Sequence, residues 1–485
     1  MELKQKTIIG LSWSFIDNFV VQAIALVVGV VLMRLLSPAE FGILAIITFF
    51  IAISTSFIDS GFGSALIRKK DCTTTDCCMV FYFNLAASIF FYGLMFFLAP
   101  FAESFFNEDG LTSVLRVAGI VLIINATGNI QHTLLVKKID FKTKTKISIV
   151  SDTLSGAIAI ILAYNGFGVW SLVWRSVLQQ SFTSILMWFM NSWRPVAVFS
   201  LKSFRELFGF GYKLALSGLI DTAYKNIYYP IIQKVFSSAT LGFYTIAEKY
   251  TSLFSTTLTT NIQRVSFPVL STVQDNPEKL RWGYRKIIKS TMMITFTLIL
   301  GLAAVAKPLI VILIGEEWLS CVPYLQLMCF STMLYPLQTM NMNIITIKGR
   351  SDLFLKLEII KKAINIPLIF VGIYLGVEAL LIGAIVTSII ACSLNSYYLA
   401  KLLDFSSKDQ LMDILPLLAV SLFVSLIVWS ITFFGWNNWV TLFLQLLAGA
   451  ALTIGFYEIM RQSNYLEMKE IVLQTLRKKW KKLLF

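Results

Sequence analysis

The sequence predicts an all-α polytopic membrane protein that crosses the bilayer about 14 times. Of its 485 residues, 57% are hydrophobic and 14% are charged, and the mean hydropathy is +0.75; soluble domains carry roughly 25% charged residues. The apolar residues form long runs, each sufficient for a transmembrane helix of ~20 residues. The gaps between these runs alternate between rich and poor in Lys and Arg, as in multi-pass proteins whose basic residues stay on the cytoplasmic side.

The apolar runs predict spans, in chain order, at residues 8–32, 41–63, 79–100, 111–133, 147–164, 168–190, 211–235, 241–268, 287–314, 322–347, 354–375, 378–400, 411–434 and 438–459. The first run is too long for the apolar part of a signal peptide and precedes no A-x-A-like site, so it is interpreted as a span. The gaps are too short for an extramembrane catalytic domain. The two longest, 191–210 and 269–286, mix basic and apolar residues and suit amphipathic helices on the membrane surface, as does the basic tail from Met460.

Basic residues mark every second gap and thereby predict the orientation. The basic gaps and the tail contain Lys4, Lys6, Arg68, Lys69, Lys70, Lys137, Lys138, Lys142, Lys144, Lys146, Arg194, Lys202, Arg205, Lys279, Arg281, Arg285, Lys286, Lys348, Arg350, Lys356, Lys401, Lys408, Arg477, Lys478, Lys479, Lys481 and Lys482. Several other gaps are acidic, with Glu103, Glu108, Asp109, Glu316 and Glu317. Both termini are therefore predicted to be cytoplasmic. The same pattern explains the net charge of +14 by orientation and anionic lipid headgroups rather than by nucleic-acid binding.

An internal repeat divides the predicted spans into two halves. Ser37-Pro-Ala-Glu-Phe-Gly42 follows the first span, and Ser237-Ser-Ala-Thr-Leu-Gly242 follows the seventh. Because six spans separate the two copies, both halves start on the same side of the membrane, as parallel repeats related by an axis along the membrane normal do. We therefore expect an N-terminal lobe at 1–205, a C-terminal lobe at 206–400, and two further helices with a basic cytoplasmic tail at 401–485.

Five charged side chains fall well inside predicted spans: Asp17, Arg175, Asp221, Lys225 and Glu248. Facing lipid, they would together cost roughly 12–17 kcal/mol. One interpretation is a central aqueous cavity for a polar, anionic substrate. The alternative is local ion pairing that only fixes helix packing.

Polar neighbours at helical spacing favour the cavity. The stripes contain Asp221, Lys225, Tyr224 and Tyr228 on span seven; Glu248, Lys249, Ser252, Ser255 and Thr259 on span eight; Arg175 and Gln179 on span six; and Asn125, Asn129 and His132 on span four. Other charges lie near helix ends, where side chains can reach the interface: Arg116, Asp59, Asp152, Arg264, Lys307, Glu358, Lys361 and Lys362.

Motifs of enzymes and metal sites are absent from the sequence. It contains no G-x-x-x-x-G-K-[ST], H-E-x-x-H or G-x-S-x-G pattern, and it has one histidine. Cys72, Cys77 and Cys78 share one gap without metal-site spacing, so free thiols are expected. The protein is therefore predicted to be neither an enzyme nor an ATP-driven pump by itself, and to need no bound cofactor.

Several motifs resemble one family along the whole chain. They are Leu36-Ser-Pro-Ala-Glu-Phe-Gly42, Arg264-Val-Ser-Phe-Pro-Val-Leu-Ser-Thr-Val-Gln-Asp275, Gly315-Glu-Glu-Trp318, Val322-Pro-Tyr-Leu-Gln326 and Lys348-Gly-Arg350. Together they resemble the polysaccharide transporter family, which includes flippases for O-antigen and exopolysaccharide units. This family belongs to the multidrug/oligosaccharidyl-lipid/polysaccharide exporter superfamily.

The resemblance implies two six-helix lobes in a V, in the cytoplasmic (inner) membrane of a bacterium. It implies translocation of an undecaprenyl-diphosphate-linked oligosaccharide by alternating access. Arg175, Lys225 and Arg264 are the candidate diphosphate contacts, and Asp17, Asp221 and Glu248 are candidates for coupling to H⁺ or Na⁺. The first span carries Asp17 and no arginine, unlike lipid II flippases. Polysaccharide polymerases and glycosyltransferases are the implied partners, beside membrane lipids and the lipid-linked glycan.

Three alternatives remain at this point. A cation-coupled multidrug antiporter of the same superfamily would have a more acidic cavity and a smaller polar path. An O-antigen polymerase or ligase would have a large external loop, which this chain lacks. A scaffolding membrane protein is disfavoured by the charges inside the spans.

Overall fold

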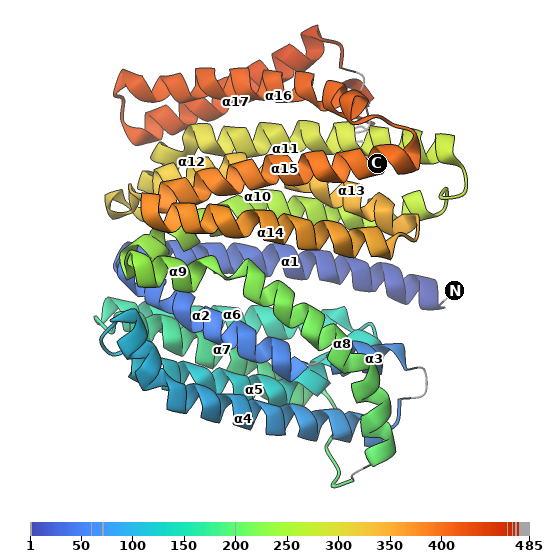
Figure 1. The fold of residues 1–485 in the computed structure, drawn as a ribbon. Helices are drawn as coiled ribbons and strands as arrows, with labels where there is room; N and C mark the ends of the chain where they lie inside the picture. Colours follow the sequence, from blue (N-terminus) through green and yellow to red (C-terminus); the bar gives the residue numbers. More distant parts are fainter. Residues whose placement is uncertain are drawn as a thin grey trace, which may run out of the picture. The chain divides into compact units, whose positions relative to one another are not determined.

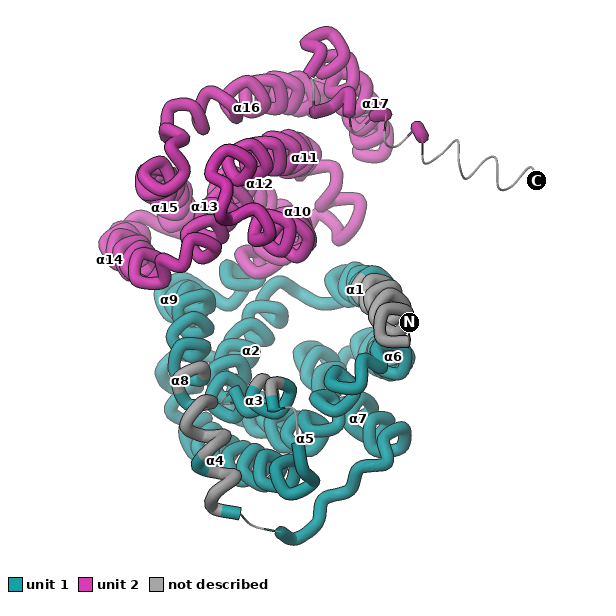
Figure 2. The backbone as a smooth tube through the Cα atoms, turned by 90° about the vertical axis from the view of Figure 1, so that its right-hand side faces the viewer, with its two compact units in different colours: residues 1–242 teal, residues 243–485 magenta. Residues whose placement is uncertain are grey.

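A computed structural model describes residues 2–59, 61–69, 72–198, 200–462, 464–467, 469–470 and 473–474. The regular structure of these residues is helical, and the chain divides by packing into two compact units, residues 1–242 and 243–485 (Figure 2). Most of the predicted basic tail, including Arg477, Lys478, Lys479, Lys481 and Lys482, lies outside the described residues.

Unit 1 is a layered bundle (Figure 1). Its helices are α1 (Glu2–Leu35), α2 (Pro38–Asp59), α3 (Phe62–Arg68), α4 (Thr74–Phe106), α5 (Leu111–Lys137), α6 (Phe141–Tyr164), α7 (Val169–Met190), α8 (Leu201–Lys225), α9 (Tyr228–Val235) and the first turn of α10 (Ser238–Ser271). Helix α4 packs along α5, α1 along α6, and α7 along both α5 and α6. This arrangement brings the polar faces of α1, α5, α6 and α7 together.

Unit 2 contains the rest of α10 and the helices after it. These are α11 (Pro277–Ile314), the 3-10 turn η1 (Glu316–Trp318), α12 (Cys321–Thr332), α13 (Tyr335–Ile347), α14 (Ser351–Leu375), α15 (Val377–Leu403), α16 (Ser407–Ser430), the 3-10 turn η2 (Ile431–Phe434) and α17 (Asn438–Ile459). Helix α11 is central, because α12, α16 and α17 all pack on it. Its residues Met292, Phe296 and Leu300 lie in a large buried apolar cluster.

Each predicted span overlaps a helix. The predicted span 41–63 runs past the end of α2 at Asp59 into the start of α3 at Phe62, and two other spans are divided near the middle. The predicted span 211–235 divides into α8, which ends at Lys225, and α9, which begins at Tyr228. The predicted span 322–347 divides into α12 and α13, with Pro336 in the first turn of α13. Among the described residues, 8 helices are long and apolar enough to cross a membrane by length and composition alone.

The expectation of a surface helix within 269–286 is wrong. Residues 277–286 form the start of α11 instead. Asn276 caps this helix by accepting a hydrogen bond from the backbone N–H of Lys279 at 3.0 Å, and Pro277 occupies the first helical position. These are strong helix-start signals, so the helix continues without interruption into the apolar run.

Packing places the unit boundary at Gly242, because α8 and α9 contact α2 and α4. This boundary describes compactness only. The predicted division into lobes at residues 205 and 400 stays a prediction.

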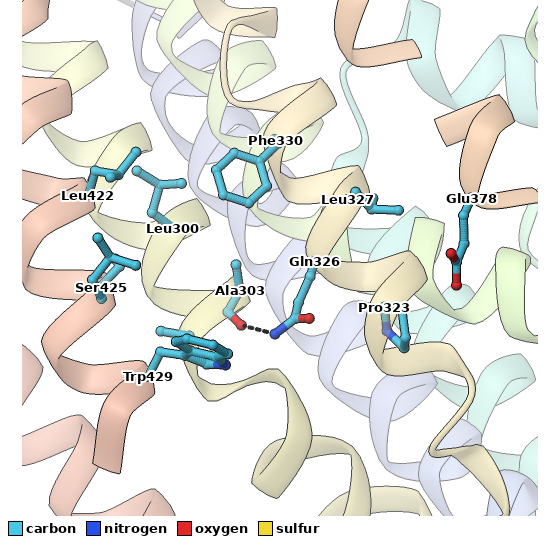
Figure 3. Close-up of a pocket in the computed structure, with 12 residues that line it drawn as sticks. Leu300, Ala303, Pro323, Gln326, Leu327, Phe330, Glu378, Leu422, Ser425 and Trp429 are labelled. Carbon is cyan, nitrogen blue, oxygen red and sulfur yellow. Dashed lines mark hydrogen bonds between the residues drawn. The ribbon is translucent and has the colours of Figure 1, made fainter. Parts of the chain in front are cut away.

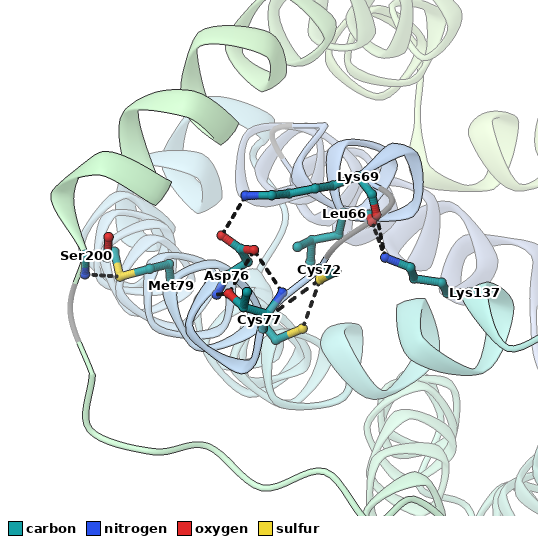
Figure 4. A network of polar contacts seen from close by, with 9 residues as sticks. Leu66, Lys69, Cys72, Asp76, Cys77, Met79, Lys137 and Ser200 are labelled. Atoms are coloured by element: carbon teal, nitrogen blue, oxygen red, sulfur yellow. Dashed lines mark hydrogen bonds and ion pairs between the residues drawn. The ribbon is translucent and has the colours of Figure 1, made fainter.

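The basic gap after α2 is held by specific contacts (Figure 4). Asp76 and Thr73 form a capping box at the start of α4, and Lys69 pairs with Asp76 at 3.1 Å. Lys137 donates to two carbonyls at the end of α3, at 3.0 Å to Leu66 and 2.7 Å to Lys69. A cation at a helix C-terminus is favourable, so Lys137 stabilises the end of α3, while Lys69 connects that end to the start of α4. Nearby, Cys72 and Cys77 are free thiols with their Sγ atoms 3.5 Å apart.

Candidate functional site

Asp17 forms an ion pair between α1 and α6. Its Oδ2 lies 3.5 Å from the Nζ of Lys144, and its side chain is only 12% exposed. The other oxygen, Oδ1, has no hydrogen-bond partner among the described residues. His132 on α5 interacts electrostatically with both groups. The sequence assigned Lys144 to a basic gap; packing of α6 along α1 makes it the counter-charge of Asp17.

A second polar contact joins α6 to α7. The amide of Gln179 donates to Oδ1 of buried Asp152 at 2.6 Å, and Arg175, one turn before Gln179, interacts electrostatically with the same carboxylate. Asp152 was expected to reach the interface, and this expectation is wrong because α7 covers it. Its signal in the sequence is the polar series Ser151, Asp152 and Ser155 in an otherwise apolar run, and all three residues are buried.

The predicted stripe on α5 makes separate contacts. Asn125 accepts a hydrogen bond from Gln180 on α7 at 3.1 Å. Asn129 donates to Asp59, the last residue of α2, at 2.7 Å. Thus Asn125 and Asn129 connect neighbouring helices, while His132 lies near the Asp17–Lys144 pair.

The polar residues at the end of α8 are more accessible. Asp221 and Lys225 form an ion pair of 2.8 Å one helical turn apart, with side chains 50% and 71% exposed. Thr222, between them in sequence, accepts a hydrogen bond from the hydroxyl of Ser56 on α2 at 2.8 Å. Tyr224 and Tyr228 flank the break between α8 and α9 and are half-buried. The Asp221–Lys225 pair is therefore open to competition from a charged ligand.

On α10, the predicted polar stripe divides into exposed and buried parts. Within the stripe, Lys249 is exposed and Glu248 is half-buried; Arg264, further along α10 and outside the predicted stripe, is exposed. Ser255 and Thr259 are buried, and their hydroxyls donate to α10's own carbonyls, at 3.1 Å to Thr251 and 2.6 Å to Ser255. The hydroxyl part of the stripe is therefore packed, whereas Arg264 is an accessible cation.

Two apolar pockets lie within unit 2. One, of about 450 Å³, is lined by residues of α11, α12, α15 and α16, and Figure 3 shows Gln326 donating to the carbonyl of Ala303 at 3.1 Å beside Phe330 and Trp429. The other, of about 420 Å³, lies among α10, α11, α16 and α17 and is lined by residues such as Leu302, Val424 and Leu446. Both have the chemistry that accommodates hydrocarbon chains.

The amino-acid sequence is similar to those of two proteins of polysaccharide biosynthesis. The chain is 25% identical over 419 residues to the lipopolysaccharide biosynthesis protein WzxC of Escherichia coli (strain K12), covering 84% of each chain. It is 26% identical over 346 residues to the teichuronic acid biosynthesis protein TuaB of Bacillus subtilis (strain 168), covering 71% of this chain and 72% of that protein.

The fold is also similar to a known structure. The lipid II flippase MurJ in an inward closed conformation superposes with a TM-score of 0.76 at 13% identity, over 93% of this chain and 99% of that one. At this identity the likeness shows a shared fold, and it confirms the predicted fold class. The family model described as "Polysaccharide biosynthesis protein" matches residues 31–323, more than half of the chain. The chain therefore belongs to the polysaccharide biosynthesis protein family of multi-pass membrane proteins.

Proposed function

We propose that this protein is a flippase that moves an undecaprenyl-diphosphate-linked oligosaccharide, a lipopolysaccharide or exopolysaccharide repeat unit, across the cytoplasmic membrane by alternating access. The family match over residues 31–323 is the observation that carries the proposal. Two relatives named for the synthesis of surface polysaccharides support it. Moving a lipid-linked glycan requires no covalent step, in agreement with a chain predicted not to be an enzyme.

The accessible cations are the proposed diphosphate contacts. Lys225 and Arg264 are both exposed, and Arg and Lys form charge-assisted hydrogen bonds to phosphate oxygens. The Asp221–Lys225 pair is exposed, and exposed ion pairs contribute only about 0–1 kcal/mol, so a diphosphate could displace it at small cost. Arg175 already faces Asp152, which suits a role in holding the polar interior of unit 1 more than direct phosphate binding.

Tyr224, Tyr228, Gln179, Asn125 and Asn129 remain candidates for sugar or headgroup contacts. Of these, Gln179, Asn125 and Asn129 already make hydrogen bonds within unit 1. Tyr224 and Tyr228 lie beside Lys225, where aromatic rings would suit a sugar. The apolar pockets of unit 2 would suit the polyprenyl chain or bilayer lipid.

Asp17 is the best-supported candidate for ion coupling. It is buried, its Oδ1 has no hydrogen-bond partner in the described part of the chain, and its counter-charge Lys144 lies 3.5 Å from the other oxygen. Proton or Na⁺ binding there would change the charge balance between α1 and α6. Asp221, Glu248 and Lys249 are less enclosed and serve as secondary candidates.

We also propose that both termini are cytoplasmic in a bacterial inner membrane, on the basis of the alternating basic gaps. In a cysteine-free background, Asp109→Cys should react with an impermeant maleimide added outside intact cells. Asp275→Cys should react only after the membrane is opened. The reverse pattern would contradict this orientation.

The function is tested by complementing a strain that lacks the gene. Lys225→Ala and Arg264→Ala should reduce surface polysaccharide while the lipid-linked oligosaccharide accumulates in the inner leaflet. Lys225→Arg should retain function, and Lys356→Ala, an exposed lysine near the start of α14, is the matched control. Normal surface polysaccharide in the Lys225→Ala/Arg264→Ala double variant would contradict the proposal that these two residues contact the diphosphate.

The alternative is a cation-coupled multidrug antiporter. It predicts that the deletion strain becomes sensitive to cationic drugs while its surface polysaccharide stays intact. The flippase predicts the opposite: loss of polysaccharide and unchanged drug sensitivity when the cell envelope is otherwise normal. Under either function, Asp17→Asn should abolish the response of transport to a collapsed ion gradient if Asp17 couples transport to that ion.

A further inference from the structure

The two copies of the internal repeat meet at their glycines. A Cβ atom placed on Gly42 would lie 1.8 Å from the carbonyl oxygen of Ser238, and one placed on Gly242 would lie 1.9 Å from the carbonyl oxygen of Pro38. The two contacts are reciprocal: each glycine near the start of one helix rests on the first turn of the other. The Cα–H bond that a Cβ would replace points at the carbonyl, an arrangement typical of closely packed helices. The first turns of α2 and α10 therefore touch backbone to backbone.

Similar local sequences build the two sides of this contact. Ser37 immediately precedes α2, and its backbone N–H donates to Oε2 of Glu40 at 2.6 Å. Ser237 immediately precedes α10, and its Oγ accepts from the backbone N–H of Thr240 at 3.1 Å. In each copy the glycine follows five residues after the serine. The caps fix where each helix begins, and the spacing then places each glycine on the contact face.

Polar groups beside the contact form hydrogen bonds between the start of α10, α9 and the end of α4. Glu108, between α4 and α5, accepts hydrogen bonds from the Ser238 hydroxyl and from Gln233 of α9, the latter at 3.1 Å. Lys234 donates to the carbonyl of Phe105 at the end of α4. This end of unit 1 carries the acidic gap 103–109, which the charge distribution assigns to the outer side of the membrane.

We propose that the reciprocal Gly42–Gly242 contact, with the Glu108–Ser238 hydrogen bond beside it, is the outer seal of the transporter and must part for the glycan to leave. This inference rests on the proposed flippase function and orientation. Neither glycine position carries a side chain that interlocks with the other helix. A hydrogen-bonded polar rim can exchange its bonds with water on opening at small net cost. The competing possibility is a permanent pivot at which the two helices never separate.

Cross-linking distinguishes a seal from a pivot. In a cysteine-free background, Glu108→Cys and Ser238→Cys are joined by a short bismethanethiosulfonate reagent, which spans the gap left by the shortened side chain and is removed by reductant. A seal predicts that the cross-linked protein loses export of surface polysaccharide and that reductant restores it. Unchanged export by the fully cross-linked protein would overturn the seal and indicate a pivot.

A matched pair controls for the reagent. Glu103→Cys and Thr112→Cys join residues of α4 and α5 whose native contact is a 2.7 Å hydrogen bond from the Thr112 backbone N–H to Glu103, and neither lies in the proposed seal. Cross-linking this pair should leave export unchanged. If the reduced Glu108→Cys/Ser238→Cys protein is inserted but exports nothing, while the cysteine-free parent exports normally, Glu108 and Ser238 do more than seal and the inference fails. If the cysteine-free and native proteins both fail to restore export in the deletion strain, the proposed function itself fails.

Glycine variants give an independent measurement. Gly42→Ala and Gly242→Ala should hold the two helices apart, so that Ser238→Cys reacts faster with an impermeant maleimide added outside. Gly93→Ala is the control, because a Cβ there meets no atom within 4 Å. Equal maleimide rates in Gly42→Ala, Gly242→Ala and the control would overturn the proposed closure.

Discussion

Arg116 on α5 donates a hydrogen bond from Nε to the backbone carbonyl of Phe96 on α4, at 3.3 Å. Phe96 precedes Pro100 by four residues, and Pro100 lies inside α4. Proline has no N–H for the carbonyl four residues earlier, so Arg116 supplies the missing donor. The guanidinium also lies 4.1 Å from the centre of the Phe96 ring. The sequence predicted that Arg116 would reach the interface, but its structural role is this contact between helices.

This relationship makes a prediction that depends on the proline. Arg116→Leu should lower the free energy of unfolding by about 1–3 kcal/mol, because it leaves a carbonyl without a donor. In a Pro100→Ala background the loss should be smaller, since alanine restores the helical N–H. A double-mutant cycle by denaturant unfolding in detergent measures the difference. Equal losses in both backgrounds would show that the proline is not the reason for this contact.

The Asp17–Lys144 pair predicts an asymmetry between single and double changes. Lys144→Met leaves a buried carboxylate without its counter-charge and should cost roughly 3–5 kcal/mol. Adding Asp17→Asn removes the charge and should recover most of the stability. Lys146→Met, at an exposed lysine on the same helix, is the control and should change stability by less than about 0.5 kcal/mol. Thermal unfolding in detergent gives the comparison, and failure of the double variant to recover would argue against a direct pair.

A buried polar network in unit 2 predicts unequal losses among its members. Asn341 accepts hydrogen bonds from the Tyr284 hydroxyl and from Gln410, the latter at 3.0 Å, and donates to Ser396 at 3.1 Å. Asn341→Leu leaves several buried groups without partners, each at a cost of about 1–3 kcal/mol. Ser396→Ala removes only one of these three hydrogen bonds of Asn341 and should cost clearly less. The unfolding free energies of both variants test this prediction. If Asn341→Leu cost no more than Ser396→Ala, the side chain of Asn341 would contribute through packing and not through its hydrogen bonds.

Close packing of α14 on α15 predicts a strong effect at Gly372. A Cβ there would lie 2.4 Å from Cγ of Leu380 and 2.8 Å from its Cα. Gly372→Ala should therefore destabilise the protein by about 1–3 kcal/mol through overpacking. Gly455→Ala on α17, where a Cβ meets no atom within 4 Å, should be neutral or slightly stabilising, because alanine favours helix more than glycine. Melting temperatures of the two variants in detergent test this prediction. A similar change in melting temperature at both sites would contradict the packing argument.

Several features of the site were predictable and others were not. The charges inside the spans identified Asp17 and Arg175 because the bilayer tolerates ionised groups only when they are compensated. The sequence placed their partners elsewhere: Lys144 in a basic gap and Asp152 near a helix end. Sequence alone does not give the axial position of one helix relative to the helix it packs against. Asp221 and Lys225 were predictable as a pair because they share a helix and lie one turn apart. The breaks between α8 and α9 and between α12 and α13 were missed, because each falls inside a run long enough to be interpreted as one span, although Lys225 and Asn226 mark the first break and Pro336 closely follows the second.

The sequence by itself determined the all-helical membrane class, the order of the long apolar helices and the repeat, because a hydrocarbon layer requires long apolar segments with internally satisfied backbones wherever the chain crosses it. Tertiary structure alone decided which charges meet and that Gly42 and Gly242 rest on each other's helix. The Asp17–Lys144 pair and the contacts of the two glycines join residues more than a hundred positions apart, and their geometry follows from how helices pack side by side, which no local pattern of residues records.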